Sequence, residues 1–158
     1  MGSINWWALI IALGLPQLAG GIGAIFTSSA VRGWYKTLVR PSIAPPNWIF
    51  GPVWTTLFLL MGIASYLVYM KGWERTDVKW ALGLFAVQLV LNVLWSLIFF
   101  GMQNPGAALI EIVIFWIAIA ATIIAFYRIS PAAAFLMVPY LAWVTFASYL
   151  NYSFWRLN

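Results

Sequence analysis

The sequence predicts an all-α integral membrane protein that forms a single domain over residues 1–158. Of its residues 65% are hydrophobic and only 7% are charged, which leaves too little polar surface for a domain that lies in water. Five apolar runs are each long enough to cross about 30 Å of hydrocarbon. These runs are continuous rather than alternating, so they indicate helices and not the strands of a barrel. We therefore expect a bundle of five transmembrane helices.

The apolar runs place these helices in order along the chain. We expect them at about residues 4–26, 47–70, 79–101, 106–127 and 132–155. The first run lacks the basic leader of a signal peptide and is long enough to span, so we interpret it as a retained helix. Asn104-Pro105-Gly106 predicts a tight turn before the fourth helix, and Ser130-Pro131 opens the fifth. Tryptophans at the ends of the runs are typical of the aromatic belt at a membrane surface, namely Trp6, Trp7, Trp48, Trp73, Trp80 and Trp155.

An odd number of spans places the two ends of the chain on opposite sides of the membrane. We define the lid side as the side that receives the loop at 27–46, the turn at 102–105 and the C-terminus. Lys and Arg divide four against four between the two sides, so the positive-inside rule does not choose an orientation. The net charge of +5 predicts contacts with lipid phosphates rather than with nucleic acid, because the basic residues are scattered. We expect a multi-pass integral membrane protein.

The chain contains no cysteine and no histidine. This excludes disulfides, Cys/His zinc sites and His-dependent catalytic triads. Of the usual haem ligands it leaves only Met and Tyr. We therefore expect no metal site and no required cofactor.

The loop at 27–46 is long for a membrane hairpin and has the composition of an ordered segment. Its apolar groups are Trp34, Tyr35, Leu38, Val39 and Ile43. Three prolines, Pro41, Pro45 and Pro46, stiffen it and disfavour helix in the residues before them. The loop either rests on the lipid interface or covers the mouth of the bundle, and we favour the second. The expected architecture is thus a five-helix bundle in which an ordered loop between helices 1 and 2 caps a ligand cavity.

Four tryptophans lie within the apolar runs rather than at their ends: Trp54, Trp95, Trp116 and Trp143. An indole N–H costs free energy when it is buried without a partner. Two helix faces carry polar residues beside these tryptophans. They comprise Gln88, Asn92, Trp95 and Ser96 in the third run, and Tyr140, Trp143, Ala147, Leu150 and Asn151 in the fifth.

Carboxamides inside a membrane face either protein or water. Interhelical hydrogen bonds are one explanation, and for Gln88 they are as good as any other. Because Asn92, Asn151 and three of the tryptophans converge toward the lid side, a cavity is the better interpretation of the group. Ala147 is small between bulky neighbours and leaves room for it.

The predicted cavity has aromatic walls and a basic rim, for which the sequence offers Arg32, Lys36 and Arg40. Such a site fits a large, flat, apolar ligand with acidic groups at its edge. Glu111 lies within the fourth run. It either pairs with a lid cation or reaches the lipid headgroups, and we favour the second.

The sequence resembles the translocator protein / tryptophan-rich sensory protein family (TspO/MBR). The resemblance is carried by GWYKTLVRPSIAPPNWIFGPVWTTLF at 33–58, QLVLNVLWSLIFFG at 88–101 and VPYLAWVTFASYLNYSFWRLN at 138–158. It implies a five-helix bundle whose first loop caps a pocket for porphyrins such as protoporphyrin IX and haem, for sterols, and for benzodiazepine-type synthetic ligands. By motif match the family's pocket positions fall on Tyr35, Trp54, Asn92, Trp95, Trp143 and Ala147.

The resemblance leaves three functions open. The first is binding of tetrapyrroles for transport or stress sensing. The second is light- and oxygen-dependent degradation of protoporphyrin IX, in which Trp54 and Trp143 would be the oxidisable partners of the ring. The third is sterol transport, based on the weak pattern formed by Leu150, Tyr152 and Arg156.

The resemblance also implies a bacterial membrane, or the mitochondrial outer membrane if the source is eukaryotic, and a homodimer. Some relatives carry a Gly-xxx-Gly pair in the third helix, suited to close helix contact. Here the sequence is Gly83-Leu-Phe-Ala-Val87. The second small residue is missing, so this dimer contact is in doubt.

Overall fold

The computed structural model describes residues 4–158 of the chain. It contains five long helices, each long and apolar enough to cross a membrane. They are α1 (Trp6–Arg32), α2 (Asn47–Tyr69), α3 (Thr76–Ser96), α4 (Pro105–Ile129) and α5 (Pro131–Leu157). A short helix η1 (Trp34–Thr37) follows α1, and a π-helical turn η2 (Leu97–Gly101) extends α3. No strand occurs in the described part of the chain, so the prediction of an all-α, multi-pass membrane protein is confirmed.

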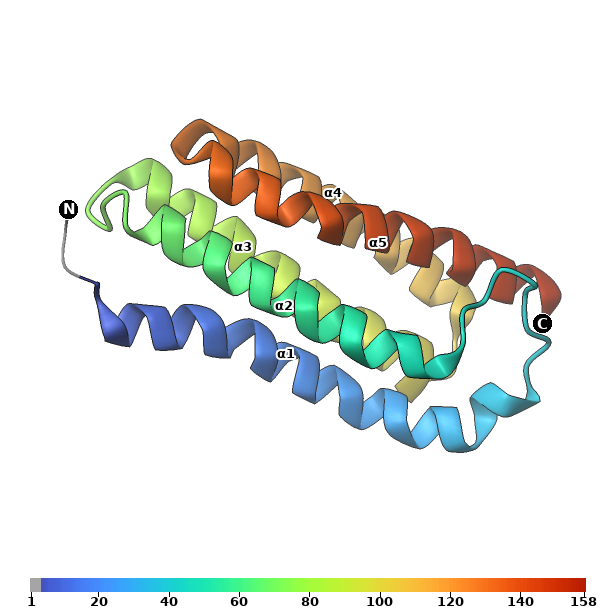
Figure 1. Ribbon diagram of the computed structural model, residues 1–158. Helices are drawn as coiled ribbons and strands as arrows, with labels where there is room; N and C mark the ends of the chain where they lie inside the picture. Colours follow the sequence, from blue (N-terminus) through green and yellow to red (C-terminus); the bar gives the residue numbers. More distant parts are fainter. Residues whose placement is uncertain (1–3) are drawn as a thin grey trace.

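The five helices run side by side along one long axis (Figure 1). The start of α1 and the end of α5 lie at opposite ends of the bundle. The loop between α1 and α2 lies at the same end as the C-terminus, which is the lid side. We call the other end, where α2 turns into α3 and α4 turns into α5, the closed end.

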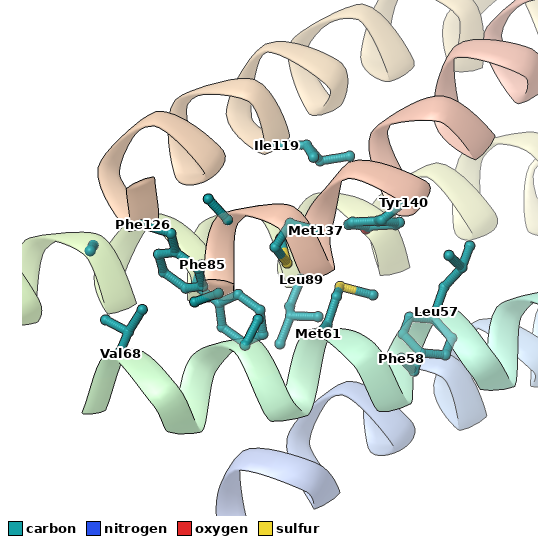
Figure 2. Close-up of a cluster of buried hydrophobic side chains, with 14 of the residues drawn as sticks. Leu57, Phe58, Met61, Val68, Phe85, Leu89, Ile119, Phe126, Met137 and Tyr140 are labelled. Atoms are coloured by element: carbon teal, nitrogen blue, oxygen red, sulfur yellow. The ribbon is translucent and has the colours of Figure 1, made fainter. Parts of the chain in front are cut away.

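The hydrophobic core lies among α2, α3, α4 and α5. Figure 2 shows its side chains, among them Met61, Phe85, Phe126 and Met137. The rings of Phe85 and Phe126 stack with their centroids 5.8 Å apart. Among the described residues α1 adds only Ala19 to this core. Since 17% of the α1 span is buried, compared with 39% of the α2 span, α1 is a flank of the bundle that faces mainly lipid.

The first helix is longer than the sequence suggested, and the loop after it is shorter. We expected α1 to end near residue 26, but it continues to Arg32. The three hydroxyl residues that follow position 26 return hydrogen bonds to carbonyl groups of the same helix: Thr27 Oγ1 to Gly23 O, Ser28 Oγ to Ile25 O and Ser29 Oγ to Phe26 O. Because these bonds satisfy the hydroxyls locally, polar residues extend the helix instead of ending it. The loop therefore covers residues 33–46.

Glycine allows α1 and α2 to approach each other backbone to backbone. A Cβ on Gly62 would lie 2.8 Å from the carbonyl oxygen of Ala12 and 2.9 Å from the Cα of Leu13. Toward the closed end Asn5 also holds α1, since its backbone N–H donates to Tyr66 and its amide donates to Tyr69. The two helices are thus fastened together from their middle to the closed end.

The loop at 33–46 is packed onto the bundle at the lid side. Tyr35 is buried, with its ring 5.2 Å from that of Phe154 and 5.8 Å from that of Phe100. Arg40 donates a hydrogen bond to the carbonyl oxygen of Pro45 and lies 5.9 Å from the Tyr35 ring. Burial raises the pKa of the Tyr35 phenol above its ordinary value, and the nearby Arg40 guanidinium opposes part of this rise. The loop is therefore ordered, as its prolines and aromatic residues predicted.

Candidate ligand-binding cavity

A cavity of about 730 Å³ occupies the lid-side half of the bundle. This volume lies within the range of small-molecule sites. Residues of α1, α2, α3, α5 and the loop line it. The cavity begins where Gln17 of α1 donates a hydrogen bond to the carbonyl oxygen of Thr55 of α2. Beyond that level toward the lid side the cavity lies beside a second cluster of buried apolar side chains, which includes Tyr35, Phe99 and Phe154.

Small residues form the α1 wall of the cavity. They are Gly20, Gly21, Gly23, Ala24, Thr27 and Ser28. A Cβ on Gly23 would lie 3.0 Å from Oγ of Ser96, so α1 passes close to α3 here. Sequence reasoning missed this wall, although the small-residue run Gly20–Ala24 was a signal that could have indicated it.

Aromatic side chains form the opposite walls. Trp54 stacks on Phe58 with ring centroids 5.4 Å apart. Trp143 meets Phe50 edge to face with centroids 5.9 Å apart. Trp95 stacks on Phe99 below the loop. Paired aromatic rings hold these walls in defined orientations, which favours recognition of a flat ligand.

Of two tryptophans that line the cavity, one has a hydrogen-bond acceptor for its indole N–H and the other does not. Nε1 of Trp95 donates to Oδ1 of Asn151 at 3.0 Å, and Nδ2 of Asn151 donates to the carbonyl oxygen of Pro105 at 2.7 Å. Asn151 therefore joins α3, α4 and α5 while its side chain lines the cavity. Nε1 of Trp143 is buried and has no partner among the described residues. It is a donor that an acceptor atom on a ligand would satisfy.

A chain of buried hydrogen bonds lies next to the cavity, toward the closed end. Nδ2 of Asn92 donates to the hydroxyl of Tyr140 at 2.9 Å, and that hydroxyl donates to Oε1 of Gln88 at 2.8 Å. Asn92 lines the cavity, but Gln88 and Tyr140 do not. Gln88 and Tyr140, both predicted to bind a ligand, instead hydrogen-bond each other and so connect α3 to α5. For Gln88 this agrees with the explanation by interhelical hydrogen bonds.

The structure brings most of the predicted pocket residues together. Those that line the cavity are Tyr35, Trp54, Asn92, Trp95, Trp143, Ala147 and Asn151. Of the three cations expected at the rim only Arg32 lines it. Arg40 is used within the loop, and Lys36, Pro45 and Pro46 are not part of the lining.

The expectation for Glu111 is wrong. It neither pairs with a lid cation nor reaches the headgroups, because it is 5% exposed and both carboxyl oxygens lack a partner among the described residues. Its position explains the error. The inward stripe of α4 includes Ala108, Glu111, Ile112 and Phe115, and this spacing turns the carboxyl toward the other helices.

The remaining tryptophan and the sterol pattern lie elsewhere. Trp116 faces outward and donates from Nε1 to the hydroxyl of Thr145 at 2.8 Å. Leu150 is buried and lines the cavity, whereas Tyr152 and Arg156 line a separate groove on the outside of α5. The three residues of the sterol pattern therefore do not share one surface.

The chain is similar over nearly its whole length to a family of known membrane proteins. The model of the TspO/MBR family matches residues 12–156. The tryptophan-rich protein TspO of Chlorobaculum tepidum is 49% identical, with 95% of each chain covered. The human translocator protein is 44% identical over 90% of this chain and 85% of its own. The tryptophan-rich sensory protein of Cereibacter sphaeroides is 36% identical over 96% and 92%. Five membrane-spanning helices, a capped cavity rich in tryptophan and this similarity agree: the chain belongs to the TspO/MBR family.

Proposed function

We propose that the lid-side cavity binds planar apolar ligands of the tetrapyrrole class, such as protoporphyrin IX and haem, for transport or stress sensing. The observation that carries this proposal is the combination of tryptophan walls with one cation. Trp54 and Trp143 both line the cavity, and Arg32 is its only charged lining residue in the described chain. Indole faces pack well against a conjugated ring. A guanidinium binds a carboxylate through paired hydrogen bonds.

Two further observations support a ligand with polar atoms at its edge or centre. The buried N–H of Trp143 has no acceptor within residues 4–158, and a carboxylate, carbonyl or ring nitrogen of a ligand would supply one. The names of relatives, translocator protein and tryptophan-rich sensory protein, fit a protein that binds a molecule and moves or senses it.

The chain has no histidine, so recognition rests on the ring system rather than on an axially ligated iron. Metal-free protoporphyrin IX should therefore bind at least as tightly as haem. Titration of both ligands into the same protein sample compares their affinities. Haem binding much tighter than protoporphyrin IX would contradict this part of the proposal.

The test of the proposal is tryptophan fluorescence quenching by protoporphyrin IX, in detergent and in the dark. We expect saturable quenching that weakens in Trp143→Phe, which loses the unpartnered N–H. Trp80→Phe is the matched control, because Trp80 is 73% exposed and outside the cavity lining. Equal weakening in both variants, or no saturable binding to the wild type, would overturn the proposal.

A second candidate function is degradation of the bound porphyrin by light and oxygen. The observation that favours it is that Trp54 and Trp143, two oxidisable side chains, line the same cavity. The porphyrin would absorb the light and O₂ would be the oxidant, so no further catalytic group is required. Illumination of the titrated samples tests this. A spectral change that needs both light and O₂, and that slows in Trp54→Phe and Trp143→Phe, would favour chemistry. If the spectral change has the same rate in both variants, the two tryptophans line the cavity but take no part in the reaction.

Sterol binding remains the third candidate. The structure gives it less support than the sequence pattern does, because Leu150 lies in the cavity while Tyr152 and Arg156 lie outside it. Sterol binding that is unaltered in Tyr152→Ser with Arg156→Leu would remove the support that the sequence pattern gives.

A further inference from the structure

A second depression lies on the lid side and shares no lining residue with the cavity. It is a shallow groove of about 280 Å³ between the loop at 33–46 and the outer face of α5. Ser42 and Ile43 belong to the loop wall, and Tyr149, Tyr152 and Arg156 belong to the α5 wall. The groove is therefore formed by two segments that are more than a hundred residues apart in the chain.

The α5 wall lies at the lid-side end of α5, where we expect the membrane surface. Tyr149, Tyr152 and Arg156 have the spacing i, i+3 and i+7, so they lie on one face of the helix. They occupy the last turns of α5, which ends at Leu157. Tyr149 is 59% exposed and Tyr152 is 43% exposed. Tyrosine and arginine at the end of a span are typical of the layer where lipid headgroups lie.

The two walls are held together by a pair of hydrogen bonds. The backbone N–H of Val39 donates to Oδ1 of Asn158 at 2.8 Å, and Nδ2 of Asn158 donates back to the carbonyl oxygen of Val39 at 3.2 Å. Beside this pair the N–H of Ala44 donates to the carbonyl oxygen of Pro41 and closes a turn in the loop wall. The groove is thus already shaped before a ligand enters it.

Arg156 has no protein partner that would neutralise its charge. Within residues 4–158 the one ion pair joins Arg75 to Asp77, and no hydrogen bond involves the Arg156 side chain. The other two acids of the sequence are Glu74, which lies with Asp77 at the closed end, and Glu111, which is buried in α4. A cation at the membrane surface that has no acidic side chain paired with it attracts anionic lipid.

We propose that this groove binds the headgroup of an anionic phospholipid such as phosphatidylglycerol. The phosphate pairs with the guanidinium of Arg156, and the hydroxyls of Tyr152 and Ser42, which also line the groove, are able to donate hydrogen bonds to it. The acyl chains lie along the lipid-facing side of α5 beside Tyr149. A bound headgroup would contact both walls and add to the Val39–Asn158 contact in holding the loop on the bundle. A sterol carries no charge, so it would leave Arg156 without a counter-ion.

The test uses the full chain, purified in detergent and depleted of lipid, with phosphatidylglycerol or phosphatidylcholine added. Native mass spectrometry counts bound lipid, and hydrogen exchange follows the amides of residues 39–44. We expect phosphatidylglycerol to bind and to slow exchange in this segment, with phosphatidylcholine doing so less. Arg156→Gln should raise the phosphatidylglycerol concentration needed for half-saturation about fivefold, since one cation is removed from the headgroup layer. Tyr152→Phe should cause a smaller loss.

Arg128→Gln is the matched control, because Arg128 is an exposed cation in the last turn of α4 at the closed end. The Arg128→Gln variant should bind phosphatidylglycerol with the same half-saturating concentration as the wild type. Equal protection of residues 39–44 in wild type and Arg156→Gln would overturn the proposal, since Arg156 would then serve only the C-terminal end of α5. Protection by cholesterol in place of phosphatidylglycerol, or equal protection by soluble glycerol 3-phosphate, would also overturn it.

Discussion

The two ends of this bundle are built from the same helices but fill their interiors differently. At the closed end the interior is packed with apolar side chains such as Val68, Phe85, Phe126 and Met137. At the lid side a smaller apolar cluster around Phe99 and Phe154 leaves room for a cavity of about 730 Å³, whose walls include tryptophans and amides. The difference teaches that polar side chains inside a membrane bundle need partners. Toward the closed end Tyr140 and Gln88 hydrogen-bond each other, whereas at the lid side polar groups also face a cavity.

Helix α5 shows the contrast within a single element. Near its start Ala133 and Ala134 are almost fully buried in the core. About three turns before its end Ala147 lines the cavity. A small residue therefore means close helix packing at one end and room for a ligand at the other. The predictions that follow use substitutions at the two ends to break or sharpen this comparison.

The largest effect is expected from Phe126→Ala at the closed end. The Phe126 side chain is fully buried and stacks on Phe85. Its loss should lower the free energy of unfolding by roughly 3–5 kcal/mol, because the cavity left behind loses its packing contacts. Unfolding in detergent measures this change. A loss of stability no larger than that of a lid-side variant such as Trp143→Phe would contradict the description of the closed end as the core.

Gly62→Ala tests the close approach of α1 and α2. The added methyl group would meet the backbone of Ala12 and Leu13, so we expect destabilisation of about 1–3 kcal/mol. Gly14→Ala is the control, since a Cβ there meets nothing within 4 Å. It should be neutral, or stabilising by up to about 1 kcal/mol through helix propensity. Similar unfolding curves for the two variants would show that the helices do not touch at Gly62.

Tyr140→Phe tests the boundary between the two ends. Removal of the hydroxyl leaves the amides of Asn92 and Gln88 without their shared partner, so stability should fall by about 1–2 kcal/mol. Ligand affinity should change little, because Tyr140 does not line the cavity. A variant with normal stability but weakened protoporphyrin IX binding would place Tyr140 in the ligand site instead.

The smallest effect is expected from the titration of Tyr35 in the loop. Burial raises its pKa above the ordinary value of 10.0. The neutral phenol therefore stabilises the packed loop below pH 10, and this contribution is lost as the pH rises through the higher folded-state pKa. The tyrosinate absorbance of wild type minus that of Tyr35→Phe gives the midpoint directly. A midpoint at or below 10 would mean that the loop does not bury this phenol.

Much of the fold could be predicted because its signals are local. The hydropathy of each run indicates a span, and the prolines and aromatic residues of the loop indicate an ordered cap. The end of α1 was missed because Thr27, Ser28 and Ser29 satisfy their hydroxyls on their own helix. Their polarity suggested a loop, whereas their hydrogen bonds extend the helix.

The site could be predicted in part, and the failures have physical reasons. Tryptophans and amides on shared helix faces indicated the cavity walls on α2, α3 and α5. The glycines of α1 have no chemistry that marks them as lining residues. The side chain of Arg40 turns into the loop, where it contacts Pro45 and Tyr35. Because these contacts form only when the loop folds, the sequence does not reveal them. Glu111 was misplaced because its charge received more weight than its position on the inward stripe of α4.

The most direct test of the difference between the two ends is one substitution made twice on α5. Ala147→Thr and Ala134→Thr add the same atoms, one in the cavity wall and one in the closed end. We predict that Ala147→Thr weakens protoporphyrin IX binding by about 1–3 kcal/mol and leaves the unfolding temperature unchanged. Ala134→Thr should lower the unfolding temperature and leave the affinity of the folded protein unchanged. Full affinity in Ala147→Thr, with the loss in Ala134→Thr, would contradict the assignment of the ligand site to the lid side.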